Sequence, residues 1–125
     1  VGSLGGTVPG PGQAAYYASK AYLQSLSEAV AAECSGLGVR VSILLPGPVN
    51  TDFHERMGTQ NSPYRHHLPD LSPQHVARAG YNGFFLAQRI IVPGVFNKVM
   101  YLAVRFLPHP LTVPLVKFLL SGSHR

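Results

Sequence analysis

Tyr16 and Lys20 are the two residues of this sequence whose types and spacing are best suited to chemistry. They lie four positions apart among good helix formers, so both side chains project from one face of the predicted helix. A tyrosine hydroxyl ordinarily ionises near pH 10, and a neighbouring ammonium group favours the ionised form. Such a pair can exchange a proton with a bound substrate, although the same spacing also occurs in plain surface pairs.

Two further motifs accompany this pair. Ser3 lies thirteen positions before Tyr16, at the end of the strand-like segment Val1-Gly2-Ser3. The turn Pro46-Gly47-Pro48-Val49-Asn50-Thr51 follows a predicted strand. Open α/β sheets bind ligands at the carboxyl ends of their strands, so this turn is a candidate binding element. Taken alone, a proline-rich turn of this kind merely ends a strand.

The elements that must position these residues alternate between helix and strand. After a glycine- and proline-rich loop over residues 3–13, we predict a helix from Ala14 to about Ser35, ended by Gly36 and Gly38. One buried apolar stripe is expected along it, formed by Leu23, Leu26, Val30 and Cys34. The β-branched run Val39–Leu45 predicts a buried parallel strand that stops at Pro46.

The second part of the chain repeats this alternation. Residues 51–57 predict a short helix capped by Thr51, and residues 58–71 show no periodicity and predict a mobile loop. Ser72 and Pro73 open a helix that runs to about Gln88, and residues 89–92 form a strand closed by Pro93 and Gly94. This alternation is typical of an α/β architecture.

Three spaced segments carry a family resemblance. Gly2-Ser3-Leu4-Gly5, Tyr16-Tyr17-Ala18-Ser19-Lys20 and Pro46–Thr51 resemble, in order and spacing, the C-terminal motifs of the short-chain dehydrogenase/reductase family. The resemblance extends to about residue 95. It implies an α/β fold, the C-terminal half of a doubly wound, Rossmann-like parallel sheet with flanking helices. We therefore expect a fragment, with residues 1–94 as this half domain and residues 95–125 as a basic amphipathic helical extension.

The resemblance also implies roles for the first two motifs. Tyr16 is expected to be the general acid/base. Lys20 is expected to stabilise its ionised form and to bond the nicotinamide ribose, so both residues bind cofactor. Ser3 is expected to hold the substrate oxygen. Tyr17 points about 100° away from Tyr16 around the helix and is not expected to take part.

For the turn, the resemblance implies binding of the nicotinamide carboxamide. Pro46 and Gly47 shape this turn, and the Val49 backbone and the Thr51 hydroxyl are expected to make the contacts. The implied cofactor is NAD(P), with NADP slightly favoured. The sequence contains no glycine-rich strand-to-helix turn for the pyrophosphate, so we expect this polypeptide by itself to bind cofactor poorly and to be inactive.

The net charge of +5 comes from the tail. Residues 1–88 are neutral overall, whereas residues 89–125 carry cations and no acid, namely Arg89, Lys98, Arg105, Lys117 and Arg125. No recognisable docking element accompanies this charge, so nucleic acid is not an expected partner. The expected partners are a small carbonyl or alcohol substrate, lipophilic in view of the apolar tail, and, by resemblance, a second copy of the full-length chain.

The tail predicts one amphipathic helix and then a broken segment. The expected apolar face comprises Val95, Phe96, Val99, Met100, Ala103, Phe106 and Leu107, with Asn97, Lys98 and Arg105 opposite. Pro108, Pro110 and Pro114 are expected to break the chain before Leu115–Leu120. Such a helix packs on its own domain or a sister subunit, or it lies on an anionic membrane or covers a lipophilic substrate site.

Other side chains point to less specific expectations. The adjacent His66 and His67 have no carboxylate or cysteine at ligand spacing, so no metal is expected. With Tyr64 they either line a substrate mouth or decorate a loop. The single cysteine, Cys34, suits a reducing compartment, and we expect a cytoplasmic protein, peripheral to a membrane if the tail binds lipid.

Two other functions stay open. A truncated, non-catalytic family member would serve as an oligomerisation or membrane-surface module, and relatives with the same Tyr–Lys spacing are isomerases or epimerases.

Overall fold

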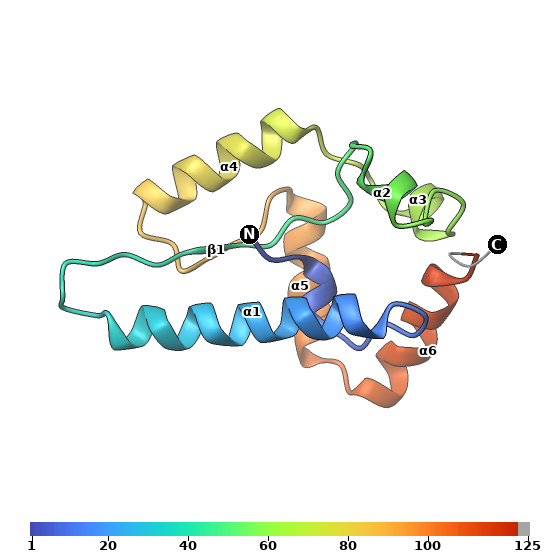
Figure 1. The fold of residues 1–125 in the computed structure, drawn as a ribbon, viewed down its shortest axis with the longest axis horizontal. Helices are drawn as coiled ribbons and strands as arrows, with labels where there is room; N and C mark the ends of the chain where they lie inside the picture. The colour runs from blue at the N-terminus through green and yellow to red at the C-terminus, as the bar shows by residue number, and fades with distance from the viewer. Residues whose placement is uncertain (123–125) are drawn as a thin grey trace.

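Two short parallel strands lie at the centre of the fold, with long helices above and below them (Figure 1). The computed structural model describes residues 1–122, so residues 123–125 of the predicted extension, including Arg125, lie outside it. The elements in chain order are the 3-10 helix η1 (Leu4–Thr7), α1 (Ala14–Glu33), β1 (Ile43–Leu44), α2 (Phe53–Arg56), α3 (Tyr64–His67), α4 (Pro73–Phe85), β2 (Ile90–Ile91), α5 (Val95–Phe106) and α6 (His109–Leu120).

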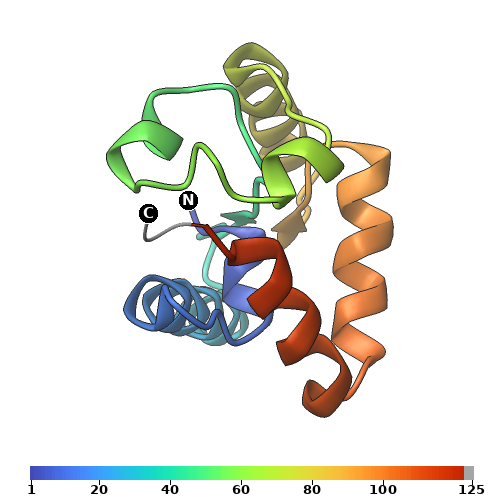
Figure 2. The same ribbon diagram turned by 90° about the vertical axis from the view of Figure 1, so that its right-hand side faces the viewer.

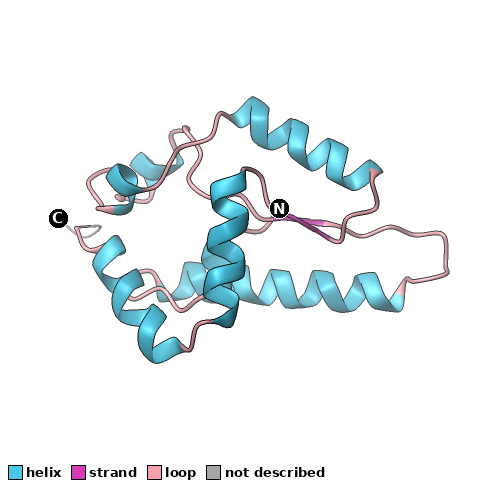
Figure 3. Cartoon of the chain, turned by 180° about the vertical axis from the view of Figure 1, so that it is seen from behind, coloured by secondary structure: helices cyan, strands magenta, loops and turns pink. Residues whose placement is uncertain are grey.

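The two strands pair in parallel, with Ile43 opposite Ile90 and Leu44 opposite Ile91. Parallel neighbours need a long crossover, and α4 is the helix of that crossover. In the three ribbon views α4 lies on one side of the strands and α1 on the other (Figures 1, 2 and 3). The predicted α/β class with parallel strands is therefore confirmed, in a chain that is mostly helical over its described residues.

Both strands are shorter than predicted. The Val39–Leu45 strand is reduced to Ile43–Leu44, because its partner β2 offers only two residues. The predicted strand tail at residues 1–3 is not a regular strand either, although the Gly2 amide donates to the Leu44 carbonyl and the Leu4 amide to the Pro46 carbonyl. A parallel ladder here needs the amide of residue 46 as the return donor, and proline has none.

Helix α1 has nearly the predicted bounds, and Gly36 and Gly38 follow it with positive φ angles of 84° and 74°. The predicted buried stripe is wrong. No residue of α1 is buried, and the Leu26 side chain is 44% exposed. The helix contacts mainly η1 and β1, which together are too small to cover its apolar side.

Helix α4 begins as predicted, with the Ser72 hydroxyl accepting a hydrogen bond from the His75 amide and Pro73 in the first turn. It ends at Phe85, three residues before the predicted end, and Ala87 adopts a positive φ of 59°. Gly83 lets α4 approach β2, because a Cβ at this position would lie 2.7 Å from the Ile91 side chain.

The core is small and lies between the strands and the helix α5. Ile43, Leu45, Val92 and Tyr101 form one buried cluster. Tyr101 brings α5 onto this cluster, and α5 stands beside β2 at one edge of the sheet (Figure 2). Many more large apolar side chains are exposed than buried, on α1 and α4 as well as on the tail.

The segment 58–71 is not the unstructured loop that the sequence predicts. It contains α3, and two of its hydroxyl side chains, Thr59 and Ser62, are almost fully buried. The short helix before it is confirmed as α2, although the residue preceding the helix is Asp52. The Thr51 hydroxyl nevertheless accepts a hydrogen bond from the Phe53 amide, at 3.3 Å.

The tail folds as two helices, α5 and α6, but the prediction of which face of α5 is buried is wrong. Asn97, placed on the exposed face by its polar character, is only 2% exposed, and Arg105 donates to the Tyr101 hydroxyl. The predicted apolar face is mostly exposed, with Val99 at 60%. The reason is that α5 faces the small core with Asn97 and Tyr101, so its apolar side points away.

Pro114 does not break the chain, since it lies inside α6. Proline removes one backbone donor but fixes a φ angle that a helix accepts, and the neighbouring turns of α6 persist around it. No helix within residues 1–122 is long and apolar enough to cross a membrane.

Candidate functional site

The three motifs lie beside one another, between the centre of the fold and one end of the molecule (Figure 1). This end, on the right in Figure 1, gathers the start of α1, the short helices α2 and α3, and the end of α6. The chain just after α6 reaches the segment before α3, because a Cβ at Gly122 would lie 3.3 Å from the Asn61 carbonyl oxygen.

Ser3 lies at the start of η1 in an extended conformation. Its Oγ accepts a hydrogen bond from the Gly5 amide at 3.1 Å, which fixes the side-chain rotamer. A hydroxyl that accepts one bond retains its own proton to donate to a second partner. The next residue, Leu4, donates its amide to the Pro46 carbonyl at 3.0 Å, so the serine segment lies directly beside the turn.

Tyr16 and Lys20 are brought together as their helical spacing predicts. The Lys20 Nζ lies 5.7 Å from the centre of the Tyr16 ring, and it also donates to the Val1 carbonyl at 3.5 Å. The Tyr16 ring contacts the Phe53 ring of α2, with 5.7 Å between their centres. Tyr16 therefore stands between its lysine and the helix that follows the turn.

The Pro46–Thr51 turn is held from several directions. The Asn50 amide donates to the Leu71 carbonyl, and the Leu71 amide donates to the Pro48 carbonyl, both at 3.0 Å. On another side, the buried Asn97 amide lies against Gly47, where a Cβ would approach Asn97 Oδ1 to 2.7 Å. Asn97 is itself fixed, since its Nδ2 donates to the Pro93 carbonyl at 3.0 Å. Gly47 is required by this close approach.

His54 is the buried polar residue nearest to the turn in sequence. Its Nε2 lies 3.1 Å from the Val49 carbonyl oxygen, and its Nδ1 lies 2.7 Å from the Tyr64 hydroxyl. The Tyr64 hydroxyl also lies 2.9 Å from Thr59 Oγ1. The pKa of His54 is lowered by burial and by the Arg65 guanidinium, against the Val49 hydrogen bond and the Asp70 carboxylate, which raise it. Burial raises the pKa of Tyr64.

Tyr17, which the sequence argument set aside, is a major contact of the serine loop. A Cβ at Gly10 would lie 2.3 Å from its ring, and one at Gly5 3.3 Å. Burial, and then the nearby Tyr64 and Tyr16 hydroxyls, raise the pKa of Tyr17 to about 12. Gly6 approaches α1 in a different way, because a Cβ there would lie 2.8 Å from the Lys20 backbone.

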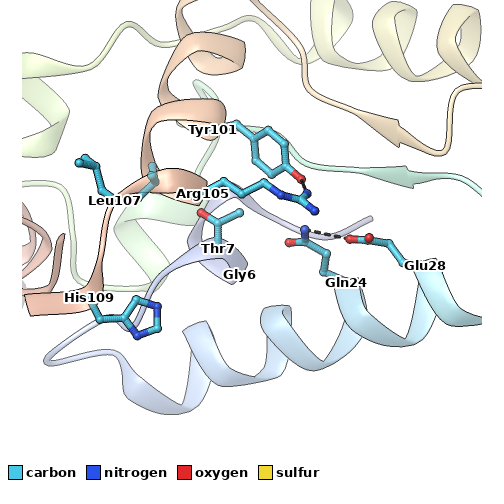
Figure 4. Close-up of a pocket in the computed structure, with 9 residues that line it drawn as sticks. Gly6, Thr7, Gln24, Glu28, Tyr101, Arg105, Leu107 and His109 are labelled. Atoms are coloured by element: carbon cyan, nitrogen blue, oxygen red, sulfur yellow. Dashed lines mark hydrogen bonds between the residues drawn. The ribbon is translucent and has the colours of Figure 1, made fainter.

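Two cavities lie beside the serine loop, and Gly6 and Thr7 line both of them. One, of about 260 Å³, is polar and lies between α1 and α5, where Arg105, Gln24 and Glu28 project toward one another (Figure 4). The other, of about 330 Å³, is lined by Tyr17, His109 and the loop before α1. Ser3, Tyr16 and Lys20 line neither of these two cavities, and all three are half-buried. The same part of the chain holds no cluster of three or more metal-ligating side chains.

The structure thus brings Tyr16 next to Lys20, and the serine segment next to the turn, in which Thr51 is exposed. Of the residues suggested for a substrate mouth, Tyr64 points inward to His54, whereas His66 and His67 are exposed. Sequence reasoning missed His54, Tyr17 and Asn97. Nothing in the sequence around Asn97 signals its role, and for His54 only its position just after the turn offered a hint.

Comparison with known proteins agrees with the motifs. A family model described as short chain dehydrogenase matches residues 1–62. An inactive 2-(S)-hydroxypropyl-CoM dehydrogenase 2 of Xanthobacter autotrophicus is 33% identical over 96 residues, which cover 76% of this chain and 40% of that protein. Sulfoacetaldehyde reductase of Chromohalobacter salexigens is 43% identical over 53 residues, covering 42% of this chain and 21% of the reductase.

The chain belongs to the short-chain dehydrogenase/reductase family. A third relative, the uncharacterized oxidoreductase YbbO of Escherichia coli, is 37% identical over 60 residues, covering 48% of this chain and 22% of YbbO. The chain therefore spans 40% or less of the length of these relatives. No solved structure matches it.

Proposed function

We propose that this chain forms the proton-transfer and nicotinamide-contacting part of an NAD(P)-dependent oxidoreductase. The reaction moves a hydride between the nicotinamide and a carbonyl or alcohol substrate. The observation that carries the proposal is the Lys20 ammonium 5.7 Å from the Tyr16 ring, beside the Pro46–Thr51 turn. The names of the relatives support oxidoreductase chemistry over a purely structural module.

The residues present fit the nicotinamide end of such a cofactor. Lys20 has N–H donors beyond its long contact to Val1, and such donors suit ribose hydroxyls. The Thr51 side chain is exposed, and the Val49 carbonyl retains a second lone pair beside its bond to His54. When bound, the cofactor supplies or takes up the hydride. Nothing in the 125 residues matches a glycine-rich phosphate turn, so the fit is limited to this end.

The roles of the side chains follow from their contacts. Tyr16 gives a proton to the substrate oxygen during reduction and takes it back during oxidation. Lys20 favours the phenolate that remains. Ser3, with its Oγ held by the Gly5 amide, donates its hydroxyl proton to the same oxygen. We propose a small carbonyl or alcohol substrate of lipophilic character, a preference for NADP, and action as a homo-oligomer.

The first test is fluorescence titration with NADH and with NADPH, on the 125-residue chain and on its natural protein where that is longer. We expect the longer protein to bind, NADPH more tightly, and the 125-residue chain to bind weakly. One relative is named as inactive, so turnover has to be measured and not assumed. Absence of binding by every form would reject the oxidoreductase proposal.

Replacing Tyr16 by Phe tests the acid/base role. The ring and its contact with Phe53 remain, so we expect cofactor affinity to stay within about twofold, while kcat falls by roughly 10³-fold or more. The matched control is Tyr22→Phe on the exposed side of the same helix, which should leave kcat unchanged. Steady-state kinetics with a model carbonyl measures both, and a Tyr16→Phe enzyme with normal kcat would contradict the role.

A further inference from the structure

We propose that His54 is a positioning residue for the turn that contacts the nicotinamide, with Tyr64 and Thr59 holding its imidazole in place. This inference rests on the proposed function, because it gives the turn a partner that fixes its shape for the cofactor. Within residues 1–122, His54 is the side chain that hydrogen-bonds to the backbone of this turn.

The hydrogen bond between His54 and the turn has a fixed direction. The Val49 carbonyl oxygen can only accept, so His54 Nε2, 3.1 Å away, must carry a proton. Nδ1 of the neutral imidazole is then a bare acceptor, and the Tyr64 hydroxyl, 2.7 Å away, is the donor that faces it. The neighbouring hydroxyl therefore sets the tautomer that can hold Val49.

The His54 ring is held so that it cannot easily rotate. His54 is only 6% exposed, its ring contacts both the Phe53 and the Tyr64 rings, and the Thr59 amide donates to its main-chain carbonyl at 2.9 Å. Thr59 is itself 1% exposed. A buried ring fixed at both nitrogens is a rigid support, and second partners of this kind orient the groups that they contact.

Helix α2, which carries His54, lies between the turn and the tyrosine proposed as the acid/base. The Val49 carbonyl is in the middle of the turn, and Phe53, which precedes His54, lies against Tyr16. Helix α2 thus contacts the turn through His54 and the acid/base tyrosine through Phe53. A shift of α2 would move the turn relative to Tyr16, so the imidazole sets their separation.

The groups facing His54 also fix its charge. They are Tyr64 and Arg65 of α3 and Asp70 of the following loop. Burial, and then the Arg65 guanidinium, lower the pKa of His54, while the Asp70 carboxylate opposes them. At neutral pH the ring is therefore uncharged, which is the form in which one nitrogen donates to Val49 and the other accepts.

The test compares three variants of the full natural protein. His54→Leu removes the donor, His54→Gln retains an N–H₂ group at about the reach of Nε2, and His67→Leu is a matched change of an exposed histidine. We expect His54→Leu to raise the KM for the nicotinamide cofactor about tenfold while kcat changes less than about threefold. His54→Gln and His67→Leu should stay within about threefold of the parent in both constants.

A merely structural histidine would give another pattern, with a lower Tm and a smaller active fraction but an unchanged cofactor KM. That pattern, or an equal KM for His54→Leu and His67→Leu, would overturn the inference. If His54→Leu does not fold, Tyr64→Phe takes its place, since it removes the donor to Nδ1 and should raise the cofactor KM about threefold through a less fixed ring. An unchanged KM for Tyr64→Phe would then overturn the inference.

An NMR readout separates this inference from the proposed function. We expect the ¹³C shift of the Val49 carbonyl to change in His54→Leu and to be retained in His54→Gln, with or without cofactor. If no form of the protein binds NADH or NADPH, the proposed function fails, and this shift alone decides whether His54 positions the turn. No change in His54→Leu would reject the positioning role even in an enzyme that binds cofactor well.

Discussion

The region around the Pro46–Thr51 turn and the two C-terminal helices have opposite polarity. Beside the turn, polar side chains such as His54 and Thr59 are buried and bonded to one another. On α5 and α6, large apolar side chains such as Val99 and Leu111 face outward. Both regions depart from the rule that apolar residues are inside, and they depart in opposite directions.

The difference has a physical cause in each region. Near the turn, the buried side chains of His54, Thr59 and Tyr64 are hydrogen-bonded to one another or to the turn, so their burial leaves none of these three groups without a partner. On α5, the small core has room for one side of the helix, and Asn97 and Tyr101 occupy it. Exposed apolar faces of this extent are typical of surfaces that contact another protein, a ligand or a membrane.

The largest expected effect concerns a buried polar group, the Tyr17 hydroxyl, whose ionisation at high pH should destabilise the folded protein. Its folded-state pKa is raised from 10.0 to about 12, so the folded state holds its proton where the unfolded state loses it. Stability is therefore complete below pH 10 and falls as the pH rises toward 12, by roughly 3 kcal/mol in total. Urea unfolding from pH 8 to 11.5 measures this loss. Tyr17→Phe should remove most of it, leaving the part that comes from Tyr64, whose pKa burial also raises, whereas Tyr22→Phe should keep it in full.

The next effect concerns the contact between the two regions. Gly47→Ala places a Cβ 2.7 Å from Asn97 Oδ1, and Asn97 cannot retreat because it is bonded to Pro93. We expect a loss of about 2 kcal/mol in the free energy of unfolding. The double variant with Asn97→Ala should recover part of that loss. Full stability of Gly47→Ala alone would show that the turn and α5 are not in close contact.

The smallest effect compares two positions of one helix. Asn97→Ala removes a buried amide and its bond to the Pro93 carbonyl, which we expect to cost about 1–2 kcal/mol. Val99→Ala, on the exposed face, should change stability by less than about 0.5 kcal/mol. Thermal unfolding of both variants measures the contrast. A costly Val99→Ala would break the comparison, because it would mean that this face is covered in solution.

Local signals predicted the elements well. Ser72 and Pro73 gave the start of α4, and the helix-forming run after Gln13 gave α1 with nearly its observed bounds. The four-residue spacing of Tyr16 and Lys20 sufficed to predict that they share a face, because that is a property of any helix. The order of the motifs sufficed for the family.

What could not be predicted depends on partners far away in the sequence. A pattern identifies two different faces of α5, but which one is buried depends on the space beside Ile43 and Val92. The burial of His54 depends on hydroxyls five and ten positions later, whose segment has no periodicity. The roles of Ser3, Tyr16, Lys20 and the turn, and the division of the chain at residue 94, stay predictions.

Gly6 and Gly10 differ in how freely they can change during evolution. At Gly6 the space is closed by the Lys20 main chain, which no substitution elsewhere can remove. At Gly10 it is closed by the Tyr17 ring, which a smaller residue would vacate. Descendants of this sequence can therefore lose Gly10 if position 17 changes in the same lineage, so these two positions should covary, whereas Gly6 should remain glycine whatever its neighbours become.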